Sequence, residues 1–288
     1  MDRRLILILV IGMGSFMFYK TWLFPLRDPD LGQKNQPASI PIKASYDVEK
    51  NIQLTFKLTN TTDLPIQGTF WSYLPLADTS NQQRHTITTT EQYHLSSEKN
   101  GQQKIHISLN NFAPFAQKII KLNLQSFLAK TPNHLTELVH RPEHHKFKQL
   151  QSIAQRLKKY DLETTLNNTY TWLTENIHYN KAIKHHPISY SLKHKQANNQ
   201  SISELAYGLL QANAIPSKLM GGFYYPRNIR LTSNDYQYWL EVWMDQRWVI
   251  MDVSKQNFIN SSEHYIAFQQ DPSELLFGAS SGLHVEIM

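Results

Sequence analysis

Two hydrophobic patterns divide most of the chain. Between residues 44 and 130, apolar side chains alternate with polar ones, as at Ile52, Leu54, Phe56 and Leu58. This is the period of a half-buried strand. Several such stretches separated by turn residues predict an antiparallel β-sandwich-like domain or a small barrel. The other stretches are residues 69–74, 105–109 and 120–124, and turn residues occur at 60–63 and 99–101.

After residue 131 the pattern becomes helical. Apolar side chains at helical spacing predict helices at residues 147–157 and 166–177. A third helix is expected at 201–213, where Ser201 and Glu204 have the spacing of a capping box. Helices followed by strands predict an α+β domain over residues 131–288. Its strands are expected at residues 218–224, 236–244 and 248–252.

A long apolar run stands near the N-terminus. It extends from Leu5 to Leu26, after Arg3 and Arg4, and as a helix it would span roughly 33 Å, enough to cross a bilayer. The arginines favour a cytoplasmic N-terminus and an exported remainder. We therefore expect residues 1–27 to form a single-pass anchor in the inner membrane of a bacterium. A polar linker at residues 28–43 would follow it, and the bulk of the chain would be periplasmic. The alternative is a cleaved signal peptide.

Composition excludes several kinds of chemistry. The chain has no cysteine, so it has no disulfide, thiolate metal site or thiol catalysis. The net charge is +6, but the basic clusters at residues 156–159 and 193–195 lack nucleic-acid-binding signatures. We interpret them as solvated surfaces and expect no nucleic-acid partner. The histidines near Pro142 and Pro187 lack the spacing of a helical zinc site, so we expect no metal and no cofactor.

Four short motifs follow one another in the second region. They are Asn176-Ile177-His178-Tyr179, the stretch AIPSKLMGGF at 214–223, Gln237-Tyr238-Trp239-Leu240-Glu241-Val242 and Trp248-Val249-Ile250-Met251-Asp252-Val253-Ser254. By their order and spacing, residues 147–254 resemble a transglutaminase-like domain of the papain-type superfamily. They resemble in particular the inactive bacterial domains of this kind that are associated with seven-helix membrane proteins.

This resemblance implies a degenerate catalytic triad. Counting back from Ile215 and Pro216 places Asn199 at the position of the family's catalytic cysteine, and Gln237 stands at that of its histidine. Only Asp252 matches the Cys-His-Asp set. A carboxamide neither attacks a carbonyl nor relays protons near neutral pH. We therefore expect a transglutaminase-like pseudoenzyme without catalytic activity.

The expected function is binding. A peptide or protein ligand would occupy the former active-site cleft, with Tyr236 and Tyr238 as candidate cleft residues, and a polytopic membrane protein is one candidate partner. Two alternatives stay open. The chain could be an active hydrolase or acyltransferase that uses Ser201 or Ser203 as its nucleophile, or it could be a purely structural envelope protein.

Overall fold

The predicted sandwich strands form because alternate side chains face one interior. The computed structural model describes residues 46–98, 101–130, 144–227, 230–273 and 275–288. In it, β1 (Val48–Asn60) pairs antiparallel with β6 (Gln117–Leu128) over most of its length. The apolar side chains of β1 from Ile52 to Leu58 are buried, and the residues between them are partly or fully exposed. This confirms the prediction that the strands between residues 44 and 130 are mostly antiparallel.

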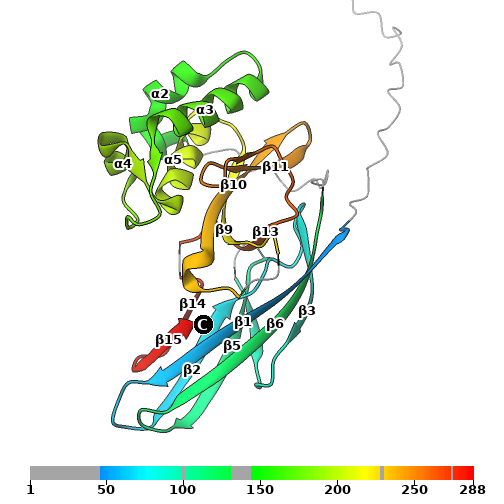
Figure 1. The fold of residues 1–288 in the computed structure, drawn as a ribbon, viewed down its shortest axis with the longest axis vertical. Coiled ribbons are helices and arrows are strands. Elements are labelled where there is room, and N and C mark those ends of the chain that lie inside the picture. Colours follow the sequence, from blue (N-terminus) through cyan, green and yellow to red (C-terminus); the bar gives the residue numbers. More distant parts are fainter. Residues whose placement is uncertain (1–45, 99–100, 131–143, 228–229, 274) are drawn as a thin grey trace, which may run out of the picture. The chain divides into compact units, whose positions relative to one another are not determined.

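Two four-stranded sheets enclose this interior, in the orders β15-β1-β6-β3 and β14-β2-β5-β4 (Figure 1). Strands β3 and β4 lack a clear apolar alternation and were not predicted. The strands besides β1 and β6 are β2 (Ile66–Tyr73), β3 (Gln82–Thr88), β4 (His94–Ser97), β5 (Gln103–Phe112), β14 (Phe277–Ala279) and β15 (Leu283–Ile287).

The last two strands correct the predicted division of the chain. Residues 131–288 were assigned to the second domain, but β14 pairs with β2 and β15 pairs with β1. The backbone N–H of Met288 also donates to the carbonyl of Thr55, at 2.9 Å. The sandwich is therefore built from both ends of the described chain. A pattern within a strand does not reveal a partner more than 200 residues away.

Among the described residues, four helices and a 3₁₀ segment form a helical layer, in which α5 contacts α2, α3 and α4. The α3 helix begins after Asp161, whose side chain accepts the backbone N–H of Thr164, a preferred N-cap arrangement. The α4 helix ends at Lys195, which has a left-handed backbone with φ 56°. The elements are η2 (His144–Leu150), α2 (Gln151–Leu157), α3 (Leu162–Asn176), α4 (Ile188–His194) and α5 (Asn199–Ala212).

An antiparallel sheet with the order β12-β11-β10-β9-β13 carries the helical layer. Side chains of α5 such as Leu205 and Leu209 share a buried cluster with Leu240 and Val242 of β10. A separate parallel pair, β7 with β8, flanks α4. The bounds are β7 (His178–Tyr179), β8 (Gln196–Ala197), β9 (Ser217–Tyr224), β10 (Tyr236–Met244), β11 (Arg247–Asp252), β12 (Asn257–Phe258) and β13 (Tyr265–Gln270), with a 3₁₀ turn η3 (Ser233–Asp235).

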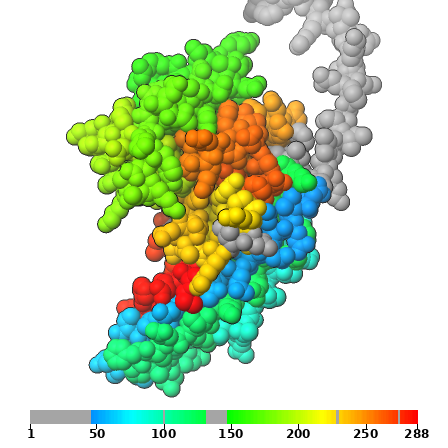
Figure 2. Space-filling view, viewed as in Figure 1, coloured from blue at the N-terminus to red at the C-terminus, as the bar shows by residue number. Residues whose placement is uncertain are grey.

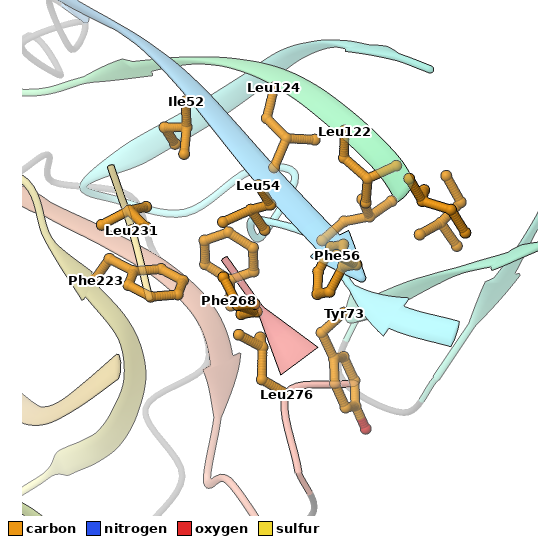
Figure 3. Close-up of a cluster of buried hydrophobic side chains, with 14 of the residues drawn as sticks. Ile52, Leu54, Phe56, Tyr73, Leu122, Leu124, Phe223, Leu231, Phe268 and Leu276 are labelled. Carbon is orange, nitrogen blue, oxygen red and sulfur yellow. The ribbon is translucent and has the colours of Figure 1, made fainter. Parts of the chain in front are cut away.

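The sandwich core continues into the five-stranded sheet. Phe223 of β9 and Phe268 of β13 belong to the same buried cluster as Leu54 and Phe56 of β1 (Figure 3). All described residues belong to one compact unit, Ile42–Met288. No helix in these described ranges is long and apolar enough to cross a membrane. The predicted anchor and linker, residues 1–27 and 28–43, lie outside those ranges.

A glutamine side chain closes the free edge of β13. The Gln82 Nε2 donates to the carbonyl of Ala267 at 2.8 Å, and the Gln82 Oε1 accepts the N–H of the same residue at 2.8 Å. The carboxamide thereby makes the two bonds that a neighbouring strand would make. Because unpaired strand edges are exposed to further pairing, this contact both joins the two regions and terminates the sheet.

Candidate functional site

The α5 helix begins at Asn199, at the position matched to the family's cysteine. The preceding residue, Asn198, is the N-cap, and its Oδ1 accepts the backbone N–H of Ser201 at 2.8 Å. The predicted capping box of Ser201 and Glu204 is therefore wrong, and the helix starts two residues earlier than expected. Asparagine is among the preferred N-caps, so a second good cap upstream determined the start. Asn199 is thus the first helical residue.

Both ends of the Asn199 carboxamide bond to the backbone of Tyr238. The Tyr238 N–H donates to Asn199 Oδ1 at 2.5 Å, and Asn199 Nδ2 donates to the Tyr238 carbonyl at 3.0 Å. Asn199 Nδ2 also donates to Ser254 Oγ at 2.9 Å. The side chain therefore acts as a hydrogen-bonding brace between the start of α5 and two segments of the sheet region.

The position of Tyr238 explains why it needs such a partner. The pairing of β10 with β11 runs from Met244 only as far as Leu240, opposite Met251. Tyr238 lies beyond that point, so β11 supplies no ladder partner for its backbone. An unpaired buried amide or carbonyl costs free energy comparable to a lost hydrogen bond. Asn199 satisfies both groups where the neighbouring strand has ended.

A chain of hydrogen bonds continues from Asn199 through Ser254 to Asp252, the aspartate of the last motif. The Ser254 hydroxyl donates to Asp252 Oδ1 at 2.8 Å, and the Tyr265 hydroxyl donates to Asp252 Oδ2 at 3.2 Å. The backbone N–H of Lys255 donates to Asp252 Oδ1 as well, at 3.1 Å. We call Asn199, Ser254, Asp252 and Tyr265 the Asn199–Asp252 network.

Burial controls the electrostatics of this network. Asp252 has 0% of its surface exposed. Desolvation raises the pKa of its carboxyl, while the hydrogen bonds from Ser254, Lys255 and Tyr265 oppose that shift. Burial and the nearby Asp252 carboxylate together raise the pKa of the Tyr265 hydroxyl. The same two causes raise the pKa of Tyr179, so the charge of Asp252 acts on several elements.

Gln237 lies on β10 opposite Gly222 of β9. Successive side chains of a strand point to opposite faces, so Gln237 shares a face with Trp239 and Glu241, and Tyr238 occupies the other face. Among the described residues, the Gln237 Oε1 is buried and has no hydrogen-bond partner. The structure therefore joins Asn199 to Asp252 by hydrogen bonds but joins Gln237 to neither.

The two tyrosines proposed for a cleft are mostly packed against other residues. Tyr236 packs edge-on against Phe223, with ring centroids 5.6 Å apart, and its hydroxyl donates to Gln269 Oε1 at 2.5 Å. Tyr238 packs against the helical cluster and lies edge-on to Tyr236. A depression of about 330 Å³ lies on the sandwich, between β1, β3 and β6, and neither tyrosine lines it.

The two candidate serines are buried and bonded to backbone. Ser201 is 1% exposed, and its hydroxyl donates to the carbonyl of His186 and accepts that residue's N–H, both at 2.9 Å. Ser203 is 4% exposed, and its hydroxyl donates to the carbonyl of Tyr238 at 2.9 Å. These bonds are to main-chain groups, which do not act as a general base.

Comparison with known proteins identifies the family of the second region. Residues 151–253 match the model of the transglutaminase-like superfamily. This region is transglutaminase-like. The match confirms the resemblance inferred from the motifs, and it begins and ends within a few residues of the predicted range 147–254. We refer to residues 151–253 as the transglutaminase-like region. No curated protein sequence matches the chain.

One solved structure shares the fold at low sequence identity, and a second has a weaker likeness. A candidate cysteine protease from Cytophaga hutchinsonii is 12% identical, with a TM-score of 0.55, over 84% of this chain and 92% of that one. The periplasmic domain of TgpA from Pseudomonas aeruginosa is 10% identical, with a TM-score of 0.40, over 70% of this chain and 88% of that one. The first likeness extends well beyond the transglutaminase-like region, so it concerns the sandwich as well.

Sequence analysis gave no role to two members of the network, Ser254 and Tyr265. Ser254 follows Asp252 by only two residues, so its nearness to the carboxylate was visible in the sequence. Tyr265 stands on β13, which pairs with β9 and not with β11. Only the tertiary structure brings its hydroxyl to Asp252.

Proposed function

We propose that this protein is a non-catalytic, membrane-anchored extracytoplasmic protein whose transglutaminase-like region binds a peptide or protein partner. The observation that carries the proposal is the bonding of Asn199. At the position of the family's nucleophile, both ends of a carboxamide are engaged by the backbone of Tyr238 and by Ser254. Such a group holds the helix to the sheet and offers no nucleophile.

The bonding of the serines also supports this proposal over an active hydrolase. A serine nucleophile needs a base that accepts its proton. The Ser201 and Ser203 hydroxyls instead bond to main-chain groups of His186 and Tyr238. The position matched to the family's histidine is Gln237, whose amide does not titrate. Substituting either serine is thus expected to affect stability and not turnover.

The location rests on the apolar run at residues 5–26 with arginines before it. A segment of this length and flanking charge favours an inner-membrane anchor with the remainder exported. Protease treatment of spheroplasts of a bacterium that expresses the chain would test this location. Digestion of the bulk of the chain with a protected N-terminal fragment is expected, and full protection would contradict the proposed topology.

An activity-based probe tests the absence of catalysis. The chain should not react with a fluorophosphonate probe, because the hydroxyls of the two buried serines bond to main-chain groups and not to a side-chain base among the described residues. Labelling that disappears on Ser201→Ala or Ser203→Ala, with the fold retained by circular dichroism, would contradict the proposal. A chain denatured before addition of the probe is the control for non-specific labelling.

Restoring a thiol tests whether Asn199 occupies the nucleophile position. Because the chain lacks cysteine, Asn199→Cys would carry a single thiol at the first residue of α5, where the helix dipole favours a thiolate. Its pKa, measured from the pH dependence of alkylation by iodoacetamide, should be lower than that of Ser281→Cys, placed at an exposed position. Equal pKa values would show that the site lacks the electrostatics of a nucleophile position.

A further inference from the structure

The segment between α3 and α5 contains basic residues without acidic ones. No Asp or Glu occurs from residue 176 to residue 203. Within this stretch the chain carries four lysines and four histidines, which we call the basic surface. They are His178, Lys181, Lys184, His185, His186, Lys193, His194 and Lys195.

Tertiary contacts bring the two ends of this segment together. In the parallel pair of β7 and β8, His178 lies opposite Gln196, and the His178 N–H donates to the Lys195 carbonyl at 2.8 Å. Three rings lie in sequence from just before α4 to its last residue. His186 lies 3.9 Å from Tyr190, and Tyr190 lies 4.3 Å from His194, measured between ring centroids. The lysines and histidines of the basic surface thus belong to one folded segment.

The basic surface is open to solvent. All its residues are exposed except His186, which is half-buried. The yellow-green atoms of this part of the chain stand at the surface in Figure 2. No large hydrophobic side chain among the described residues 178–197 is exposed. The surface is therefore both charged and free of an apolar anchor.

One carboxylate of the next helix faces this surface. Glu204 of α5 has its Oε2 2.8 Å from His185 Nε2, and its Oε1 accepts a bond from Gln200 at 3.0 Å. Glu204 also contributes to raising the pKa of Tyr238, after burial. Glu204 thus lies between the basic surface and the residues around Asn199. Its contact with His185 is the kind of contact that the carboxylate of a ligand would make with this surface.

We propose that the basic surface binds an acidic peptide segment of a partner protein. This inference rests on the proposed function and names the chemistry of the partner. Exposed lysines without acidic neighbours attract anions and orient an incoming acidic chain. The surface directly borders the start of α5, because the Ser201 hydroxyl accepts the backbone N–H of His186 and donates to its carbonyl.

Two other polyanions fit the surface less well. A lipid surface is bound most firmly when apolar side chains insert beside the charges, and none is exposed here. Single-stranded nucleic acid needs ring faces on which bases stack. The ring of Tyr190 in α4 is already stacked on His186 and lies tilted against His194.

Binding of a defined probe tests the proposal. The full chain, purified in a non-ionic detergent, is titrated against a short labelled peptide of alternating Glu and Ser, followed by fluorescence anisotropy. The same peptide with Gln in place of Glu is the neutral control. Tighter binding of the acidic peptide, weakened by added salt, is expected.

Matched variants locate the site. Lys184→Gln with Lys193→Gln should weaken acidic-peptide binding about fivefold to tenfold, because exposed ion pairs each contribute modestly. Lys121→Gln with Lys130→Gln removes the same charge from exposed positions elsewhere and should leave binding unchanged. Glu204→Gln should strengthen binding, since it removes a competing carboxylate.

Other results would overturn the inference. Equal binding by the two double variants would place the peptide elsewhere. Stronger retention of an oligonucleotide or of micelles containing phosphatidylglycerol, lost in the Lys184 and Lys193 double variant, would assign the surface to another class of partner. Each result leaves the fluorophosphonate test unaffected, so failure here is distinguishable from failure of the proposed absence of catalysis.

Discussion

In the part of the chain that the structure describes, no charged side chain is buried between the two sandwich sheets, whereas the five-stranded sheet buries two carboxylates. Among the described residues, Glu241 and Asp252 are the buried acidic residues, at 2% and 0% exposure. They stand on neighbouring strands, β10 and β11. Burying a charge is costly unless it is paired or hydrogen-bonded, so a sheet that served only as a scaffold would not need either residue.

The two carboxylates are satisfied to different degrees. Asp252 accepts bonds from Ser254, Lys255 and Tyr265. Glu241 accepts one bond from Asn81, at 2.7 Å, and its Oε2 has no hydrogen-bond partner among the described residues. Burial raises the pKa of Glu241, opposed by Lys218 and Asn81. The sandwich depends on apolar packing, and the transglutaminase-like region depends in addition on bonded polar groups.

The largest expected effect is in the sandwich. Phe56→Ala should lower the free energy of unfolding by about 3–5 kcal/mol, because it removes a fully buried ring and leaves a cavity. The ring lies 4.8 Å from that of Phe70 and 5.3 Å from that of Phe277. Urea unfolding measures the loss. Phe115→Ala is the control, since Phe115 is 67% exposed, and a similar loss there would contradict the comparison.

A smaller effect is expected where polar bonds replace apolar packing. Asn199→Ala should lower the free energy of unfolding by about 1–3 kcal/mol, because it leaves the backbone N–H and carbonyl of Tyr238 without their partner. Asn199→Asp keeps an acceptor for the N–H but no donor for the carbonyl or for Ser254, so it should not restore the wild-type value. Urea unfolding again provides the measurement. An unchanged urea midpoint for Asn199→Ala would contradict the interpretation that Asn199 stabilises the contact between α5 and the sheet.

The smallest expected effect is a pH dependence of the free energy of unfolding, which arises from Asp252 in the transglutaminase-like region. The pKa of Asp252 is raised in the folded state, chiefly by burial, so the folded chain binds this proton more readily than the unfolded chain. Its contribution to stability is present at low pH and is lost as the pH rises through the folded-state pKa. The stability of wild type relative to Asp252→Asn should therefore fall with rising pH. A constant difference between pH 4 and 8, measured by urea unfolding, would contradict this.

The local sequence patterns predicted much of this fold because they depend on neighbouring residues. Alternation from Ile52 to Leu58 predicted β1, and the motif around Trp239 predicted β10. Helical spacing predicted α3 and α5. The start of α5 was misplaced because Ser201 and Asn198 are both plausible caps, and only the bond that forms distinguishes them. Strands β14 and β15 were missed because their partners lie far away in the sequence.

The identity of the residues at the candidate site was determined by the sequence alone. It placed carboxamides where the resemblance expects a thiol and an imidazole, and it excluded thiol chemistry through the absence of cysteine. What those residues do was decided by the tertiary structure. Asn199 bonds to Tyr238 because β11 ends before reaching it, and Tyr265 reaches Asp252 from a strand that is not its neighbour. Hydrogen-bond partners of this kind depend on strand lengths and packing between distant segments, which a local sequence pattern does not encode.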